Sequence, residues 1–172
     1  MTLVRLFYDA PENLGKFAEV RAEEMPAPFR TLLAHQGHMT ETVEAFHHSP
    51  VDVRVLETEI EDSHYARKIL LARQSDGKVV QFGIVRLDFA YVSAEVRREI
   101  ESQKIPLGRV LIQHNVMREI QLTKLWKVTP GSDLQNYFGI SATVTTFGRT
   151  ALINCNGQPA VELLEIVAPM DA

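Results

Sequence analysis

Two short turn signals, Asp76-Gly77 and Asn156-Gly157, do most to constrain how this chain folds. An Asp-Gly or Asn-Gly pair between two β-rich segments is typical of a β-hairpin, because these residues tolerate the positive φ angles of a two-residue turn. The first pair separates segments 67–73 and 78–89, and the second separates segments 142–155 and 159–167. These signals predict four strands in two antiparallel hairpins.

Further elements follow from the spacing of apolar residues and from capping residues. Alternation at 51, 53 and 55 predicts another strand, and segment 121–128 is expected to form a sixth. Helices are expected at 12–24, 29–34, 40–48 (capped by Thr40), 93–104 (capped by Ser93), and from Pro106 onward with Leu107, Val110, Leu111, His114 and Met117 on one buried face. Six antiparallel strands with helices grouped between them define an α+β fold.

Composition limits the class of protein. The chain has 172 residues, 45% of them hydrophobic, so we expect one globular domain, 1–172, with residues 1–28 as a peripheral N-terminal segment. A net charge of −4 without a basic block argues against a nucleic-acid partner, and no apolar run is long enough to favour a membrane. A small anion held by a few arginines stays compatible with this charge. The single cysteine, Cys155, and the lack of a signal-peptide pattern favour a reducing, cytoplasmic location.

Four histidines, His35, His38, His47 and His48, fall close together in the sequence. Their spacing matches neither the H-E-x-x-H pattern nor a Cys/His zinc pattern. We therefore expect no metal site and interpret these histidines as surface or helix-end residues.

Charged residues occur on predicted strand faces that are otherwise apolar. In the last strand Glu162 lies on one face and Glu165 on the other, because side chains alternate along a strand. Arg67 and Arg149 interrupt apolar alternation in two other strands. A charge on a buried face needs a partner, so these residues either form structural ion pairs or line one polar pocket. Spacing alone leaves both readings open.

Four separated pieces of the sequence share the order and spacing of a known pattern. They are Met39-Thr40, Arg67-Lys68-Ile69-Leu70-Leu71 with Asp76-Gly77, Pro106-Leu107-Gly108-Arg109, and Phe147-Gly148-Arg149 followed by Asn156-Gly157-Gln158-Pro159, Glu165 and Pro169. Together they resemble the chorismate lyase family (chorismate–pyruvate lyases, or 4-hydroxybenzoate synthases) over residues 30–169. The resemblance implies a six-stranded antiparallel sheet whose helical flaps close over an internal ligand pocket.

The resemblance also implies a function and a set of site residues. The expected activity is that of a carbon–oxygen lyase, which converts the anionic precursor chorismate to 4-hydroxybenzoate and pyruvate without a cofactor and is associated with ubiquinone biosynthesis. The family's ligand contacts correspond to Met39, Arg67, Leu107 and Glu165 here, which chooses Glu165 over Glu162. Arg67 and Glu165 are the expected catalytic residues, and Arg149 is a second candidate contact for the anion.

Some residues depart from the family pattern. His38 occupies the place of the usual serine before methionine, Phe147 that of tryptophan, and Thr150 that of a second arginine. The segment Met117-Arg118-Glu119 matches the family's T-R-D only with an offset of one residue. These differences bear on the flaps and the substrate more than on the fold.

Two other functions fit the same resemblance. The UTRA sensor domains of bacterial transcription regulators are similar to chorismate lyase in fold and bind small effectors, such as an aromatic acid, without chemistry. About 28 residues precede the matched region, which is short for a DNA-reading domain, so a stand-alone regulator is the less expected reading. The third reading is a related lyase that releases another hydroxybenzoate.

Overall fold

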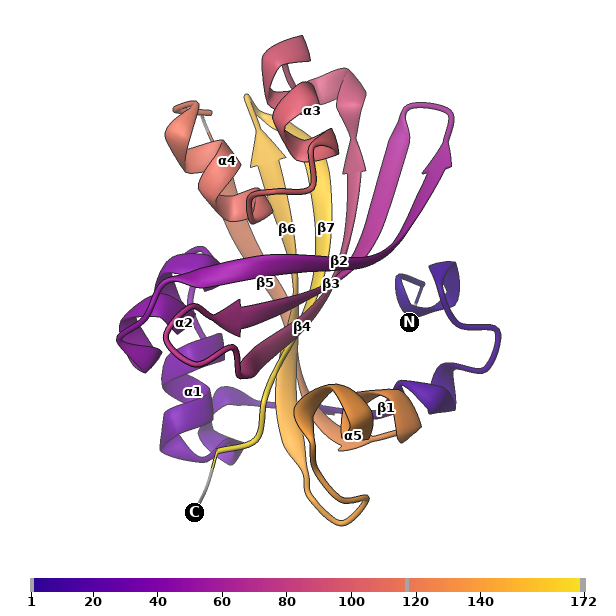
Figure 1. The fold of residues 1–172 in the computed structure, drawn as a ribbon, viewed down its shortest axis with the longest axis vertical. Coiled ribbons are helices and arrows are strands. Elements are labelled where there is room, and N and C mark those ends of the chain that lie inside the picture. The colour runs from indigo at the N-terminus through magenta and orange to yellow at the C-terminus, as the bar shows by residue number, and fades with distance from the viewer. Residues whose placement is uncertain (1, 117, 171–172) are drawn as a thin grey trace.

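A computed structural model of the chain describes residues 2–116 and 118–170. Its described residues contain one antiparallel sheet in the order β1-β5-β6-β7-β4-β3-β2 (Figure 1). The strands are β1 (Gly15–Val20), β2 (Val51–Glu61), β3 (His64–Arg73), β4 (Val79–Asp88), β5 (Arg118–Pro130), β6 (Thr146–Cys155) and β7 (Gln158–Val167). The expected α+β class is confirmed, with seven strands in place of six.

The two hairpin signals differ in outcome. Asn156 and Gly157 form the expected two-residue turn between β6 and β7, with φ angles of 51° and 81°. The turn between β3 and β4 is longer than expected, because β3 ends at Arg73 and β4 begins only at Val79. The Asp76 carboxylate explains the longer turn, since it accepts hydrogen bonds from the Arg73 side chain and from the backbone N–H of Lys78 at 3.0 Å each.

The segment expected as a helix at 12–24 contains strand β1, flanked by short 3-10 turns at Pro11–Asn13 and Ala22–Glu24. β1 pairs with β5 from Gly15 opposite Pro130 to Val20 opposite Leu125. This long-range pairing gives the β5 edge its backbone hydrogen bonds, and it overrides the weak local preference for a helix. The N-terminal segment expected at the periphery thus adds the seventh strand, and it contributes five buried side chains to the core: Leu3, Val4, Tyr8, Leu14 and Met25.

The helices cover both faces of the sheet. On one face, α1 (Ala27–Leu33) and α2 (Met39–His47) pack at one end, and α3 (Ala94–Glu101) and α4 (Leu107–Gln113) pack at the other (Figure 1). The opposite face is covered by the N-terminal segment and by α5 (Ser132–Phe138). The first four helices match expected ones, whereas α5 was not expected. Met117, expected on the buried face of α4, lies outside the described residues.

Strand alternation decides what each helix pair covers. In β4 the side chains of Phe82 and Ile84 belong to the core beneath α5, while Val85 packs towards α3 and α4.

The Ser93 hydroxyl caps α3 by accepting a hydrogen bond from the Val96 backbone N–H at 3.2 Å. Thr40 does not cap α2, whose N-cap residue is His38. In the described residues, no helix has the length and apolar character needed to span a membrane.

A substitution at the junction between β5 and α5 tests how the N-terminal segment is held against the rest of the domain. Gly131 donates its backbone N–H to the Leu14 carbonyl at 2.8 Å, and a Cβ at residue 131 would collide with the carbonyl oxygens of Glu12 and Asn13. We expect Gly131→Ala to lower the free energy of unfolding by roughly 2–4 kcal/mol, because backbone must move. Urea denaturation followed by circular dichroism measures the change.

The matched control is Gly139→Ala. Gly139 has a φ of 64°, and no atom lies within 4 Å of the position of an added Cβ. Gly139→Ala should therefore lower the free energy of unfolding by only about 1 kcal/mol, the cost of placing an alanine at a positive φ angle. Equal losses in the two variants would contradict the close packing described at Gly131.

Candidate functional site: a pocket between the sheet and two helix starts

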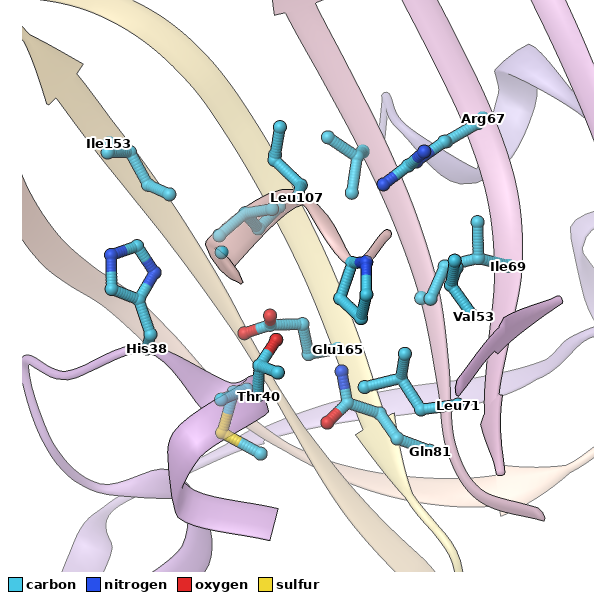
Figure 2. Close-up of a pocket in the computed structure, with 16 residues that line it drawn as sticks. His38, Thr40, Val53, Arg67, Ile69, Leu71, Gln81, Leu107, Ile153 and Glu165 are labelled. Atoms are coloured by element: carbon cyan, nitrogen blue, oxygen red, sulfur yellow. The ribbon is translucent and has the colours of Figure 1, made fainter. Parts of the chain in front are cut away.

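A pocket lies between the centre of the sheet and the first residues of α2 and α4 (Figure 2). It encloses about 470 Å³ of space not filled by atoms, part of it open to solvent. Its walls are mainly apolar, with a few polar side chains among them. The lining residues are His38, Met39, Thr40, Val53, Arg67, Ile69, Leu71, Gln81, Gly83, Val85, Pro106, Leu107, Gly108, Ile153, Leu163 and Glu165.

The sheet is hollow at this point because a glycine sits in the middle of one cross-strand row. Ile69 on β3 is paired with Gly83 on β4, which in turn is paired with Glu165 on β7. A Cβ at Gly83 would lie 3.3 Å from the Ile69 side chain, so any larger residue would fill part of the floor. Two residues further along each strand, and so on the same face of the sheet, Arg67 is paired with Val85. Arg67 and Glu165 therefore lie on the same face of the sheet and line the same pocket.

Arg67 is a buried cation with few hydrogen-bond partners. It is only 1% exposed, and the one hydrogen bond that its side chain forms with a described residue, from Nη2 to the Ile105 carbonyl, is long at 3.4 Å. Its Nε and Nη1 atoms have no hydrogen-bond partner among the described residues. Burial lowers the pKa of this guanidinium, because the charged form is separated from water, and the nearby Tyr65 side chain partly opposes this shift. In Figure 2 the guanidinium is directed into the pocket, where an anion would supply the missing acceptors.

In Arg149, by contrast, each of the three side-chain nitrogens has a hydrogen-bond partner in the protein. Its Nε donates to the Glu165 carboxylate at 2.7 Å, and its two terminal nitrogens donate to the carbonyls of His35 and Gly37 at 3.0 and 2.9 Å. Arg149 is 0% exposed and does not line the pocket. Arg149 is therefore not among the residues that line this pocket, where the sequence analysis expected a second contact for the anion.

Met39 and Leu107 begin the two helices that roof the pocket. Both are buried and line it. The helix starts approach closely at Gly108, where an added Cβ would lie 3.1 Å from the His38 ring. A salt bridge between Arg109 on α4 and Glu44 on α2 links the same two helices. The two expected apolar contacts thus lie in the roof, one from each helix.

The sequence analysis missed three polar residues of the pocket: Thr40, which was expected only as a helix cap, Gln81 and His38. Gln81 is 3% exposed, and its Oε1 atom has no partner among the described residues. Its alternation with Gly83 and Val85 on β4 was the available signal. His38 was expected at the surface, but it is 7% exposed and lines the pocket. Its Nε2 atom accepts a hydrogen bond from Arg118 Nε at 2.6 Å.

His38 is held in its neutral form. Burial, together with the nearby positive charges of Arg118 and Arg149, lowers its pKa to about 4. Within the part of the chain that the structure describes, no group of three or more His, Cys, Asp or Glu side chains is arranged to hold a metal ion.

Comparisons with known proteins establish the fold. No protein-family model matches the sequence, and no curated protein matches it. Among solved structures, the effector domain of PhnF from Mycobacterium smegmatis aligns with a TM-score of 0.56 at 12% identity, over 79% of this chain and 96% of that domain. The longer PhnF chain gives 0.56 at 11% identity, over 78% of this chain. A protein from Streptomyces coelicolor assigned as a transcriptional regulator gives 0.51 at 13%, over 70% of this chain and 88% of its own.

This chain spans only 64% of the longer PhnF chain. The similarities confirm the chorismate lyase-like architecture that the sequence predicted, with one more strand. At 11–13% identity they concern the fold.

The expectation of a chorismate-converting lyase is wrong. The solved structures reported above are the effector domain of PhnF, the longer PhnF chain, and a protein assigned as a transcriptional regulator. The pocket gives a physical reason. Chorismate carries two carboxylates, but Arg149 is already neutralised by Glu165, so among the described lining residues only Arg67 offers an unpaired positive charge. Two further expectations depended on the lyase activity and fall with it. They are the catalytic roles of Arg67 and Glu165 and the link to ubiquinone biosynthesis.

The same substitution at the two glutamates of β7 should lower the free energy of unfolding by very different amounts. Glu165→Gln leaves the buried Arg149 without a counter-charge and should lower the free energy of unfolding by about 3–5 kcal/mol. Glu162 pairs with Arg86 at 3.7 Å in a solvent-exposed position, so Glu162→Gln should cost about 1 kcal/mol or less. Urea denaturation of both variants measures the difference. Similar small losses would show that the Arg149–Glu165 pair does not hold the structure.

The neutral state of His38 predicts a pH dependence of stability. Its pKa in the folded protein, about 4, lies below the ordinary value of 6.5, so its contribution is complete above pH 6.5 and is lost as the pH falls towards 4. Between pH 7 and pH 5 we expect the wild type to lose roughly 2 kcal/mol more unfolding free energy than His38→Asn, which cannot titrate. Urea denaturation at several pH values measures the two slopes. Parallel slopes would contradict the burial of a neutral imidazole at residue 38.

Proposed function

We propose that this chain is an effector-binding domain that holds a small aromatic carboxylate in the pocket without transforming it. The observation that carries the proposal is the buried guanidinium of Arg67, which is directed into the pocket and whose Nε and Nη1 atoms have no partner among the described residues (Figure 2).

The energetics of Arg67 favour an anionic ligand. A buried charge without a partner costs several kcal/mol, and an entering carboxylate offsets this cost by charge-assisted hydrogen bonds. Two N–H groups of the planar guanidinium match the two oxygens of a carboxylate better than a lysine would. Since Arg149 and Glu165 neutralise each other, the pocket favours a ligand with one negative charge.

The walls favour a flat apolar body behind the carboxylate. Val53, Ile69 and Leu71 come from β2 and β3, and Ile153 and Leu163 come from β6 and β7. Gly83 leaves the floor open between them. With Leu107 above, this space suits an aromatic ring, which gains free energy by leaving water.

The solved structures support a binding role over catalysis. The effector domain of PhnF shares this fold over 96% of its length, and the Streptomyces coelicolor protein is assigned as a transcriptional regulator. The expectation of no nucleic-acid partner rested on net charge alone, and a fold shared with a protein assigned as a transcriptional regulator gives it no support.

Isothermal titration calorimetry with 4-hydroxybenzoate and with benzoate tests the proposal. We expect saturable binding to the wild type and a loss of roughly 10–100-fold in affinity in Arg67→Met, because one charge-assisted contact is worth about 1.5–3 kcal/mol. Chorismate incubated with the protein should remain unchanged on chromatography.

Arg86→Met is the matched control. Arg86 lies on β4 outside the pocket, so its loss should leave the affinity unchanged. Arg67→Met removes a buried unpaired charge and should be at least as stable as the wild type without ligand, which separates lost binding from lost folding. Full affinity in Arg67→Met, or no binding of either acid by the wild type, would overturn the proposal.

A further inference from the structure

His38 is the residue of the pocket that the sequence comparison left unexplained, since it stands where the chorismate lyase pattern has a serine. It is the N-cap residue of α2, and its side chain makes no capping hydrogen bond to that helix. The ring is 93% buried and lies at the far side of the pocket from Arg67 in Figure 2. A buried imidazole in this position needs partners for both ring nitrogens.

The first ring nitrogen has a partner that fixes where the proton sits. Arg118 at the start of β5 donates its Nε–H to His38 Nε2 at 2.6 Å. Because an arginine can only donate, Nε2 must carry a lone pair, and the single proton of the neutral ring is on Nδ1. Arg118 also donates to the Val116 carbonyl at 3.1 Å, which holds the guanidinium in place.

The second ring nitrogen faces the pocket. Figure 2 shows His38 with the nitrogen next to its Cγ turned towards the pocket and the other turned away. The space in front of this nitrogen exists because residue 108 has no side chain: a Cβ there would lie 3.1 Å from His38 Nδ1 and 3.2 Å from the Thr40 hydroxyl. No hydrogen bond from Nδ1 to a described residue is formed, so its N–H is available to a ligand.

The Glu165 carboxylate adds an acceptor at the same end. It lines the pocket and points to the His38 side, away from Arg67, in Figure 2. One of its oxygens accepts from Arg149, and the ion pair carries no net charge. A ligand group that meets both residues must accept from His38, donate to Glu165 and be uncharged. A hydroxyl group satisfies all three conditions.

We propose that His38 is a specificity-determining residue whose Nδ1–H donates a hydrogen bond to a hydroxyl at the end of the ligand remote from its carboxylate, with Arg118 as the positioning residue that fixes this tautomer. The inference rests on the proposed binding of a small aromatic carboxylate. It narrows that class to hydroxy acids whose hydroxyl lies across the ring from the carboxylate.

The ratio of two affinities tests the inference. We expect wild-type protein to bind 4-hydroxybenzoate about 10-fold more tightly than benzoate, which has no hydroxyl and leaves the His38 N–H unpaired. His38→Ala should reduce this ratio to near 1 by weakening 4-hydroxybenzoate binding alone. His38→Asn should keep most of the preference, because its amide N–H can replace Nδ1–H.

The tautomer is measured independently of any ligand. Long-range ¹H–¹⁵N correlation NMR of the wild type should show His38 protonated at Nδ1 only. In Arg118→Met the ring should sample both tautomers, and the preference for 4-hydroxybenzoate should fall several-fold while benzoate affinity is kept. A purely structural role of Arg118 would weaken both acids equally.

The outcomes separate this inference from the proposed function. If the wild type binds both acids but prefers benzoate or shows no preference, or if His38→Ala keeps the full preference, the role of His38 is overturned and the binding function stands. Protonation of His38 at Nε2 in the wild type also overturns it. If the wild type binds neither acid, the proposed function fails, and the inference fails with it.

Discussion

The buried ion pair between Arg149 and Glu165 is the interaction on which the rest of the structure depends. It joins β6 to β7 in one cross-strand row, and the remaining N–H groups of Arg149 hold the carbonyls of His35 and Gly37. Those carbonyls belong to the segment that leads into α2. A side chain of the sheet therefore helps to position the start of α2, which roofs the pocket. Breaking the pair would weaken both the contact between β6 and β7 and the contacts that hold this roof.

The same pair decides the charge of the pocket. Glu165 would otherwise be a buried free anion opposite Arg67, and the two could neutralise each other across the cavity. With Glu165 committed to Arg149, Arg67 keeps its positive charge for a ligand, and the Glu165 side of the pocket is polar but uncharged. A pocket with one charged end and one neutral hydrogen-bonding end favours a ligand in one orientation. This asymmetry of the pocket fits the proposed recognition of a monoanion better than the conversion of a dianion.

The sequence predicted those parts of the fold that local chemistry specifies. Asn156-Gly157 identified the β6–β7 hairpin, and Ser93 identified the start of α3, because each acts on its immediate neighbours. β1 was missed because it depends on pairing with β5, more than 100 residues away. Alternation placed Arg67 and Glu165 on apolar faces, yet only the cross-strand register shows which of the two arginines Glu165 meets. The resemblance to chorismate lyase predicted the scaffold correctly and the chemistry wrongly, since a shared scaffold does not fix the function of its pocket.

The central claim is that Arg67 is available to bind a ligand anion, whereas Arg149 is already paired with Glu165. NMR of the arginine Nε–H groups tests this claim most directly. The Nε–H signals of Arg67 and Arg149, assigned from lysine variants of each, are followed while 4-hydroxybenzoate is added to the wild-type protein. The Arg67 signal should move progressively and saturate as a carboxylate takes up its free N–H groups, and the Arg149 signal should stay near its starting position because Glu165 already occupies it. A saturating change at Arg149 with none at Arg67 would contradict the account.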